Sequence, residues 1–200
     1  MTHEVADHSH SHHQDGPDPK VTFGFWIYIM TDCMMFAGLF ATYVVLKNNT
    51  YGGPGISMIS NLHDVLVRTI VLLLMVLTSG FTMVAMHKKA VCRTQFWLLV
   101  SILVGLCFLS LQYHELECVV KMGYDWQSNA FMSAYFTTLI FYCVHISVAL
   151  LWSLVLIVQL GMQKLDSMMQ TRVTCLNMFV NFLSIIWVFI FTIVYVMGAV

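Results

Sequence analysis

The chain has 200 residues, of which 59% are hydrophobic and 10% charged, and its formal net charge is −1 at pH 7. The near-neutral charge and the absence of basic runs argue against nucleic-acid binding. The apolar composition is typical of a protein built mainly within a lipid bilayer, which leaves no room for a soluble catalytic domain.

Residues 1–20 differ from the rest of the chain because they are polar and rich in histidine, with a His-rich core from His8 to His13. Histidine binds zinc, copper and nickel, so metal binding by this segment is chemically possible. A polar segment without fixed geometry is more typical of a solvated, disordered tail. The sequence predicts a disordered, cytoplasmic, His-rich tail over 1–20 and one membrane domain over 21–200.

Five apolar stretches fill the sequence after the tail, and each reaches the roughly 20 residues that a helix needs to cross the hydrocarbon core. They are continuous apolar runs and not alternating short segments, which excludes a transmembrane β-barrel. The predicted fold is therefore all-α, an integral membrane bundle of five transmembrane helices. The predicted spans are Val21–Leu46, Val65–Met86, Phe96–Val120, Ala130–Leu160 and Cys175–Ala199.

Positive charges in the loops predict the orientation of the bundle. The second loop carries Lys88, Lys89 and Arg93, and the fourth carries Lys164 and Arg172. Loops rich in Lys and Arg stay in the cytoplasm. We therefore expect the N-terminus inside and the C-terminus outside.

Cysteine and histidine residues in the spans give no recognisable metal motif. The six cysteines are scattered without a Cys-x-x-Cys pair, and we expect them to be small side chains buried by helix packing. His114 and Cys118 lie four residues apart on one helix face. Two ligands make at most half of a tetrahedral site, so either a partial metal site or a packed His beside a Cys fits this spacing.

Charged and titratable residues inside the spans are the main candidates for a functional site, because a charge in lipid normally faces a partner or a cavity. At 1.5 Å per residue, Arg68 and Glu115 lie about 5 and 7 Å below the outer ends of their helices. Asp32 and His145 lie about 20 and 22 Å deep by the same rise. We predict an Arg68–Glu115 contact in the outer layer and an Asp32–His145 contact at mid-depth. The second contact could relay protons or act as a structural hydrogen bond between helices.

Three segments of the chain together have a distinctive pattern: the opening span from Phe23 to Tyr43, the Tyr51-Gly52-Gly53-Pro54 turn and the ending from Phe191 to Val200. These segments resemble the haem–copper oxidase subunit III family, in its cytochrome bo-type ubiquinol oxidase branch. By this resemblance, Asp32 matches a membrane carboxylate associated with proton handling and lipid contacts.

Other positions match the family's motifs only in part. Glu115 matches the second carboxylate of a Glu-x-x-Glu pattern whose first position is Gln112, and His145 matches the second His of a His-Gly-x-His pattern whose first position is Tyr142. In the last span, Asn181 and Ser184 stand where the family has His and Asp. All four replacements stay neutral near pH 7, which suggests a reduced internal charge network.

The resemblance implies a non-catalytic accessory subunit of a terminal ubiquinol oxidase in the bacterial inner membrane. It implies no catalytic, cofactor-binding or metal-binding residue in this chain, and places haem and copper in the partner large subunit. The implied partners are oxidase subunits I, II and IV and membrane phospholipids, with Ala37 and Ala41 spaced for close helix contact. The alternatives are a metal-handling membrane protein or transporter, and a scaffold protein with no oxidase attached.

Overall fold

The computed structural model describes residues 18–47, 62–124, 127–162 and 167–196. In these residues, five helices are long and apolar enough to cross a membrane, which confirms the predicted five-span, all-α architecture. The helices are α1 (Pro19–Leu46), α3 (Leu62–His87), α4 (Val91–Lys121), α5 (Ala130–Met162) and α6 (Ser167–Ile190), and the π-helical turn η1 (Phe191–Val196) continues α6. The Gly-Gly-Pro turn and residues 1–17 of the His-rich tail lie outside the described residues.

The helices extend beyond the apolar stretches that predict them. The last helix begins at Ser167, well before the expected Cys175, because a helix need not be apolar where it leaves the hydrocarbon core. The first begins at Pro19, where the Asp18 side chain accepts a hydrogen bond of 3.0 Å from the Lys20 amide. Asp at the N-cap followed by Pro at the first helical position is a strong helix start.

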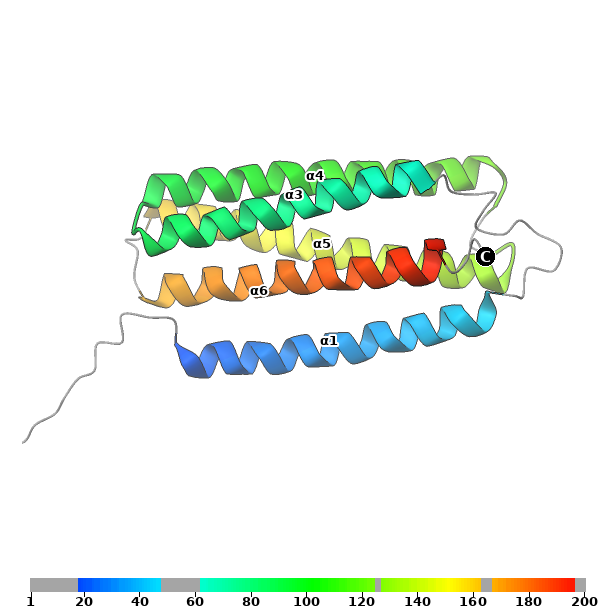
Figure 1. The fold of residues 1–200 in the computed structure, drawn as a ribbon, viewed down its shortest axis with the longest axis horizontal. Helices are drawn as coiled ribbons and strands as arrows, with labels where there is room; N and C mark the ends of the chain where they lie inside the picture. Colours follow the sequence, from blue (N-terminus) through cyan, green and yellow to red (C-terminus); the bar gives the residue numbers. More distant parts are fainter. Residues whose placement is uncertain (1–17, 48–61, 125–126, 163–166, 197–200) are drawn as a thin grey trace, which may run out of the picture.

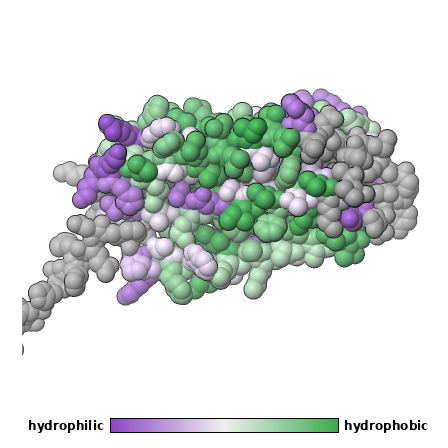
Figure 2. Space-filling view, viewed as in Figure 1, coloured by the Kyte–Doolittle hydropathy of each residue, from purple (hydrophilic) through white to green (hydrophobic). Residues whose placement is uncertain are grey.

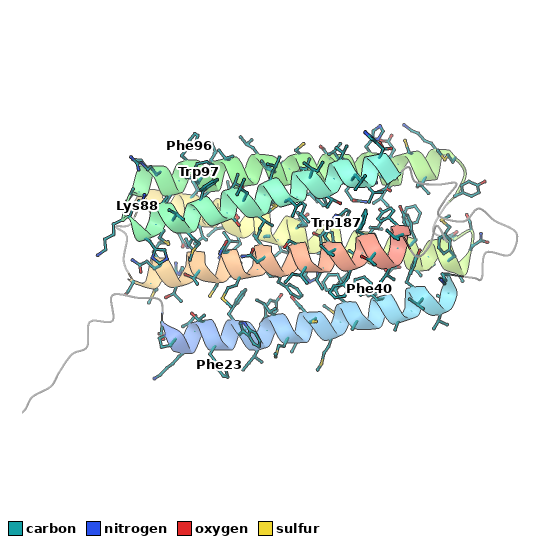
Figure 3. All side chains as sticks on the ribbon, viewed as in Figure 1. Phe23, Phe40, Lys88, Phe96, Trp97 and Trp187 are labelled. Atoms are coloured by element: carbon teal, nitrogen blue, oxygen red, sulfur yellow. The ribbon has the colours of Figure 1, made fainter. Side chains whose placement is uncertain are left out.

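Helix α6 lies in the middle of the bundle, between α3 and α1, with α5 behind it (Figure 1). Helices α3 and α4 form the most extensive pair, and α1 packs at the opposite edge on α5, α6 and η1. Trp187 is fully buried in the aromatic core that these helices share. Figure 3 places Trp187 and Phe40 between helices, whereas Phe23 and Phe96 lie at the outer surface.

The outer surface of the bundle is mainly apolar, with polar residues gathered toward its ends (Figure 2). Met34 is 78% exposed and Leu151 is 67% exposed, whereas Asp32, Arg68 and Gln112 are buried. This inverts the distribution of a soluble protein and fits a bundle solvated by lipid. The expectation that helix packing buries the cysteines is wrong for the side chains that face outward, Cys33, Cys92 and Cys107.

Gly105 on α4 permits close contact with α5, because a Cβ at this position would overlap the Leu150 side chain. We expect Gly105→Ala to be less stable than Gly80→Ala by about 1–3 kcal/mol, the usual cost of overpacking. Gly80 on α3 is the matched control because a Cβ there would meet no atom within 4 Å. Unfolding of the purified chain in mixed micelles, followed by tryptophan fluorescence, measures the difference. Equal stabilities would contradict this packing role.

Candidate functional site

Arg68 of α3 and Glu115 of α4 form an ion pair inside the bundle, as their depths predicted. Their side chains are only 3% and 10% exposed. Both lie about 9 Å from the nearer end of their helix, given 1.5 Å per residue. A buried ion pair is stable only when its remaining hydrogen-bonding groups are also satisfied, so the surroundings of the pair decide its role.

Neutral side chains from α4, α5 and η1 form hydrogen bonds with the Arg68–Glu115 ion pair. Gln112 donates from Nε2 to Glu115 Oε2 at 2.8 Å, and its Oε1 accepts from Arg68 at 3.3 Å. The hydroxyls of Tyr135 and Tyr195 each donate to Glu115 Oε1 at 3.2 Å. We name Arg68, Gln112, Glu115, Tyr135 and Tyr195 the outer cluster. It joins α3, α4, α5 and η1 through charge-assisted hydrogen bonds.

The guanidinium of Arg68 is held on two further sides. Its Nε donates to the Asp64 carbonyl at 3.2 Å, and its Cζ lies 5.6 Å from the centre of the Tyr195 ring. A cation above an aromatic face is stabilised by the negative face of the ring. The outer cluster therefore fixes the arginine in one position.

The sequence interpretation identified only the ion pair of this cluster. Tyr135 and Tyr195 were not singled out, although each lies near a helix end at the same side of the bundle as Arg68, so depth matching of the polar aromatic residues would have found them. Gln112 was interpreted as a lost charge, but it bridges the arginine and the carboxylate.

The π-helical turn at the end of α6 was also not predicted, and it presents Tyr195 to the outer cluster. A π turn leaves backbone groups free of their usual helical partners. In η1 the Val194 carbonyl accepts a hydrogen bond of 3.2 Å from the buried Tyr43 hydroxyl. Tyr43 belongs to α1, so this turn also fixes the C-terminal end of the first helix.

Asp32 of α1 and His145 of α5 meet at mid-depth, as predicted. His145 Nε2 lies 3.8 Å from Asp32 Oδ2, and the side chains are 11% and 7% exposed. The ring of Phe36 has its centre 5.1 Å from that of His145, and Phe141 lies at 4.7 Å. The pair therefore lies in an aromatic enclosure away from water.

The hydrogen bonds of His145 constrain the protons in this pair. Its Nδ1 lies 2.9 Å from the Phe141 carbonyl, and because a carbonyl only accepts, Nδ1 must carry a hydrogen. Asp32 Oδ2 has no hydrogen-bond partner among the described residues. A neutral His145 would present a lone pair to an ionised Asp32, which is repulsive. The contact is attractive when one proton lies between Nε2 and Oδ2.

The other candidate ligands lie apart from these two sites. His114 is exposed and Cys118 half-buried, and Glu117 pairs with Lys121 at 2.7 Å on the exposed end of α4. No group of three or more His, Cys, Asp or Glu side chains that could hold a metal ion occurs within the described ranges.

An apolar exterior and two buried polar contacts between helices define an integral membrane bundle held together by internal polar groups. Residues 3–199 match the family model for cytochrome c oxidase subunit III. The chain belongs to this family.

Curated relatives match over nearly their whole length. The chain is 41% identical to the cytochrome bo(3) ubiquinol oxidase subunit 3 of Pseudomonas aeruginosa, over 98% of this chain and 93% of the relative. It is 35% identical to the protein of the same name from Buchnera aphidicola, over 98% and 96%. A cytochrome c oxidase subunit 3 from a Bacillus species is 33% identical over 88% and 86%.

Proposed function

We propose that this chain is the non-catalytic accessory subunit III of a terminal ubiquinol oxidase in the bacterial inner membrane. The observation that carries the proposal is the 41% identity, over nearly full length, to a cytochrome bo(3) ubiquinol oxidase subunit 3. Identity to a cytochrome c oxidase subunit 3 is lower, at 33%. Quinol oxidase subunits also predominate among the similar proteins, which favours ubiquinol as the electron donor of the complex.

Redox chemistry in such a complex belongs to partner subunits. Haem iron and copper are held by several axial or equatorial side chains, histidines above all. Of the described histidines only His145 is buried, and it faces Asp32. The donor set of the described residues does not fit a haem or copper centre, and we place both cofactors in the large subunit. Subunits I, II and IV are the proposed partners.

The outer cluster and the Asp32–His145 pair act in this proposal as structural contacts. The outer cluster closes on itself, and each of its hydrogen bonds joins residues within the bundle. The Asp32–His145 pair joins α1 to α5 at one level. A proton path needs a continuous chain of polar groups across the membrane. The outer cluster and the Asp32–His145 pair lie at two separate depths, which favours a role in helix association over a role in proton transfer.

The distribution of cations supports an orientation with the N-terminus in the cytoplasm. Lys88, Lys89, Arg93 and Arg172 lie at the end of the bundle where α1 begins, and Figure 3 labels Lys88 at this end. Loops rich in Lys and Arg stay in the cytoplasm. The outer cluster then lies near the periplasmic side.

A groove between α4 and α5 supports direct contact with phospholipid. Its volume is about 620 Å³, and apolar residues such as Leu109, Leu116, Phe136 and Ile140 line most of it, together with the charged Glu117. We propose that an acyl chain occupies this groove, because its lining is mainly apolar and lies between two membrane-spanning helices.

Purification of the tagged chain in mild detergent tests the proposed function. We expect a large multi-span partner in the mass spectrum, haem bands in the reduced-minus-oxidised spectrum, and turnover with a ubiquinol analogue but not with reduced cytochrome c. An untagged strain serves as the control. A chain that is recovered without haem would overturn the proposal, and bound metal in that preparation would support the metal-handling alternative.

A further inference from the structure

The outward face of α6 carries polar side chains in the middle of the membrane. Thr174, Asn177, Asn181 and Ser184 are spaced three and four residues apart, so they lie on one face of the helix. Asn181 is exposed and the other three are half-buried. In the view of Figures 1 and 2, where α6 lies between α3 and α1, polar residues interrupt the apolar surface. We name these four residues the α6 polar face.

Asn181 lies at the middle of its span. The span covers Ser167–Val196, and Asn181 is about 21 Å from its first residue at 1.5 Å per residue. The hydrocarbon core is about 30 Å thick, so this side chain is far from the headgroups on either side. Lipid at this depth offers only acyl chains, which cannot accept or donate a hydrogen bond.

The hydrogen bonds within the α6 polar face leave part of Asn181 unpaired. Asn177 Oδ1 accepts from Ser79 at 3.1 Å, and Ser184 donates to the Asn181 carbonyl at 2.7 Å. Asn181 donates one N–H from Nδ2 to the Asn177 carbonyl at 2.9 Å. Its Oδ1 and its second N–H have no partner among the described residues. An unsatisfied amide in hydrocarbon costs several kcal/mol.

Other polar groups deep in the described spans avoid this cost. Asp32 and His145 lie at similar depth but face each other, and the Gln112 amide is buried in the outer cluster. Exposed Ser147, at the middle of α5, donates its hydroxyl to its own helix at 2.8 Å. Asn181 therefore differs from them in pointing an unpaired amide out of the bundle at the level of the acyl chains.

We propose that the α6 polar face docks a transmembrane helix of another oxidase subunit, and that this helix offers a side-chain donor and acceptor to Asn181 at mid-membrane. The proposal rests on the proposed function, because it assumes an oxidase complex around this chain. Small and polar residues at three- and four-residue spacing allow helices to approach closely and to form hydrogen bonds across the contact. A Ser, Thr, Asn or Gln on the docking helix has the required chemistry.

Retention of the chain in the purified oxidase tests the docking face. We expect Asn181→Leu to lower the ratio of this chain to the haem-containing subunit by about 3- to 20-fold as detergent is raised, the effect of losing one interhelical hydrogen bond. Asn181→Gln should restore most of the retention. Ser110→Leu is the matched control, because it replaces an exposed polar side chain on α4 whose hydroxyl already donates to the Cys107 carbonyl of its own helix at 2.8 Å. Equal loss in the two leucine variants, or none in either, would overturn the proposal.

A photo-crosslinking residue at position 181 identifies the occupant directly. We expect an adduct with another subunit of the oxidase, and none from the same residue at Leu151, an exposed position on α5. An adduct with a second copy of this chain would overturn the docking proposal. Crosslinking to a lipid or a quinone only, with no adduct to another subunit, would overturn it as well. A wild-type chain that purifies without a haem-containing partner would instead overturn the proposed function, so the two failures are distinguishable.

Discussion

Glu115→Gln is expected to lower the free energy of unfolding by about 3–5 kcal/mol, because it leaves the Arg68 charge buried without its counter-charge. The arginine side chain is 3% exposed, and its other hydrogen-bond acceptors are the neutral Gln112 side chain, the Tyr195 hydroxyl and the Asp64 carbonyl. Glutamine keeps the shape of the side chain, so the loss would report charge and not packing. Unfolding of the purified chain in mixed micelles, followed by tryptophan fluorescence, is the measurement.

Two further variants distinguish the effect of breaking the buried ion pair from the effect of losing a charge: a double variant that removes both buried charges, and a variant at an exposed ion pair. Arg68→Met combined with Glu115→Leu removes both charges, and such replacements are often neutral or stabilising, so we expect this variant to recover most of the loss. Lys121→Met breaks the exposed pair with Glu117 and should leave stability unchanged, because exposed ion pairs contribute little. A Glu115→Gln variant as stable as Lys121→Met would contradict a buried, mutually dependent pair.

The five spans could be predicted because their signal is local. A run of about 20 apolar residues is sufficient to place a helix in the membrane, whatever the rest of the chain does. Helix ends were less predictable, since the polar first turns of α6 (Ser167 onward) are set by hydrogen bonding and not by hydropathy. The π-helical turn could not be predicted from hydropathy, and its contact with the Tyr43 hydroxyl joins residues far apart in the sequence.

The two polar contacts were predictable from depth alone. Each spanning helix has a fixed rise per residue, so a charge and its partner must lie at the same level. This argument correctly paired Arg68 with Glu115 and Asp32 with His145. It did not find Tyr135 and Tyr195, since it considered only charges and histidines. Uncharged polar groups that complete a buried ion pair require the same depth analysis.

The two sites hold different parts of the bundle. The outer cluster joins α3, α4, α5 and η1, but it includes no residue of α1. Helix α1 packs at the edge, on α5, α6 and η1, and it is the least buried of the five spans. Its polar contacts to the rest of the bundle include Asp32–His145 and the Tyr43 hydroxyl on the Val194 carbonyl. The mid-depth pair is therefore one of the polar contacts that fix the position of α1.

His145→Phe is expected to destabilise the docking of α1 by about 1–3 kcal/mol, because it replaces the polar ring that faces Asp32 Oδ2 by an apolar one, and this buried oxygen has no hydrogen-bond partner among the described residues. Asp32→Asn should be tolerated far better, since its amide can donate a hydrogen to His145 Nε2 and so keep an attractive polar contact at this position. Asp32→Leu combined with His145→Phe removes both polar groups, and we expect it to be more stable than His145→Phe alone.

The release of α1 is measured by the rate at which a cysteine placed at Phe36, which packs against His145, reacts with a membrane-permeable thiol reagent. The background for this experiment replaces the native cysteines, and the same cysteine in an otherwise unchanged bundle is the reference. Faster labelling in His145→Phe than in Asp32→Asn would follow from an attractive polar contact between the two facing side chains, which lie 3.8 Å apart. Labelling accelerated equally by both variants would contradict this account, because the asparagine amide supplies a donor at the same position. Because α1 carries no part of the outer cluster, the Arg68–Glu115 contact should persist in both variants, and loosening of the bundle should remain confined to its first helix.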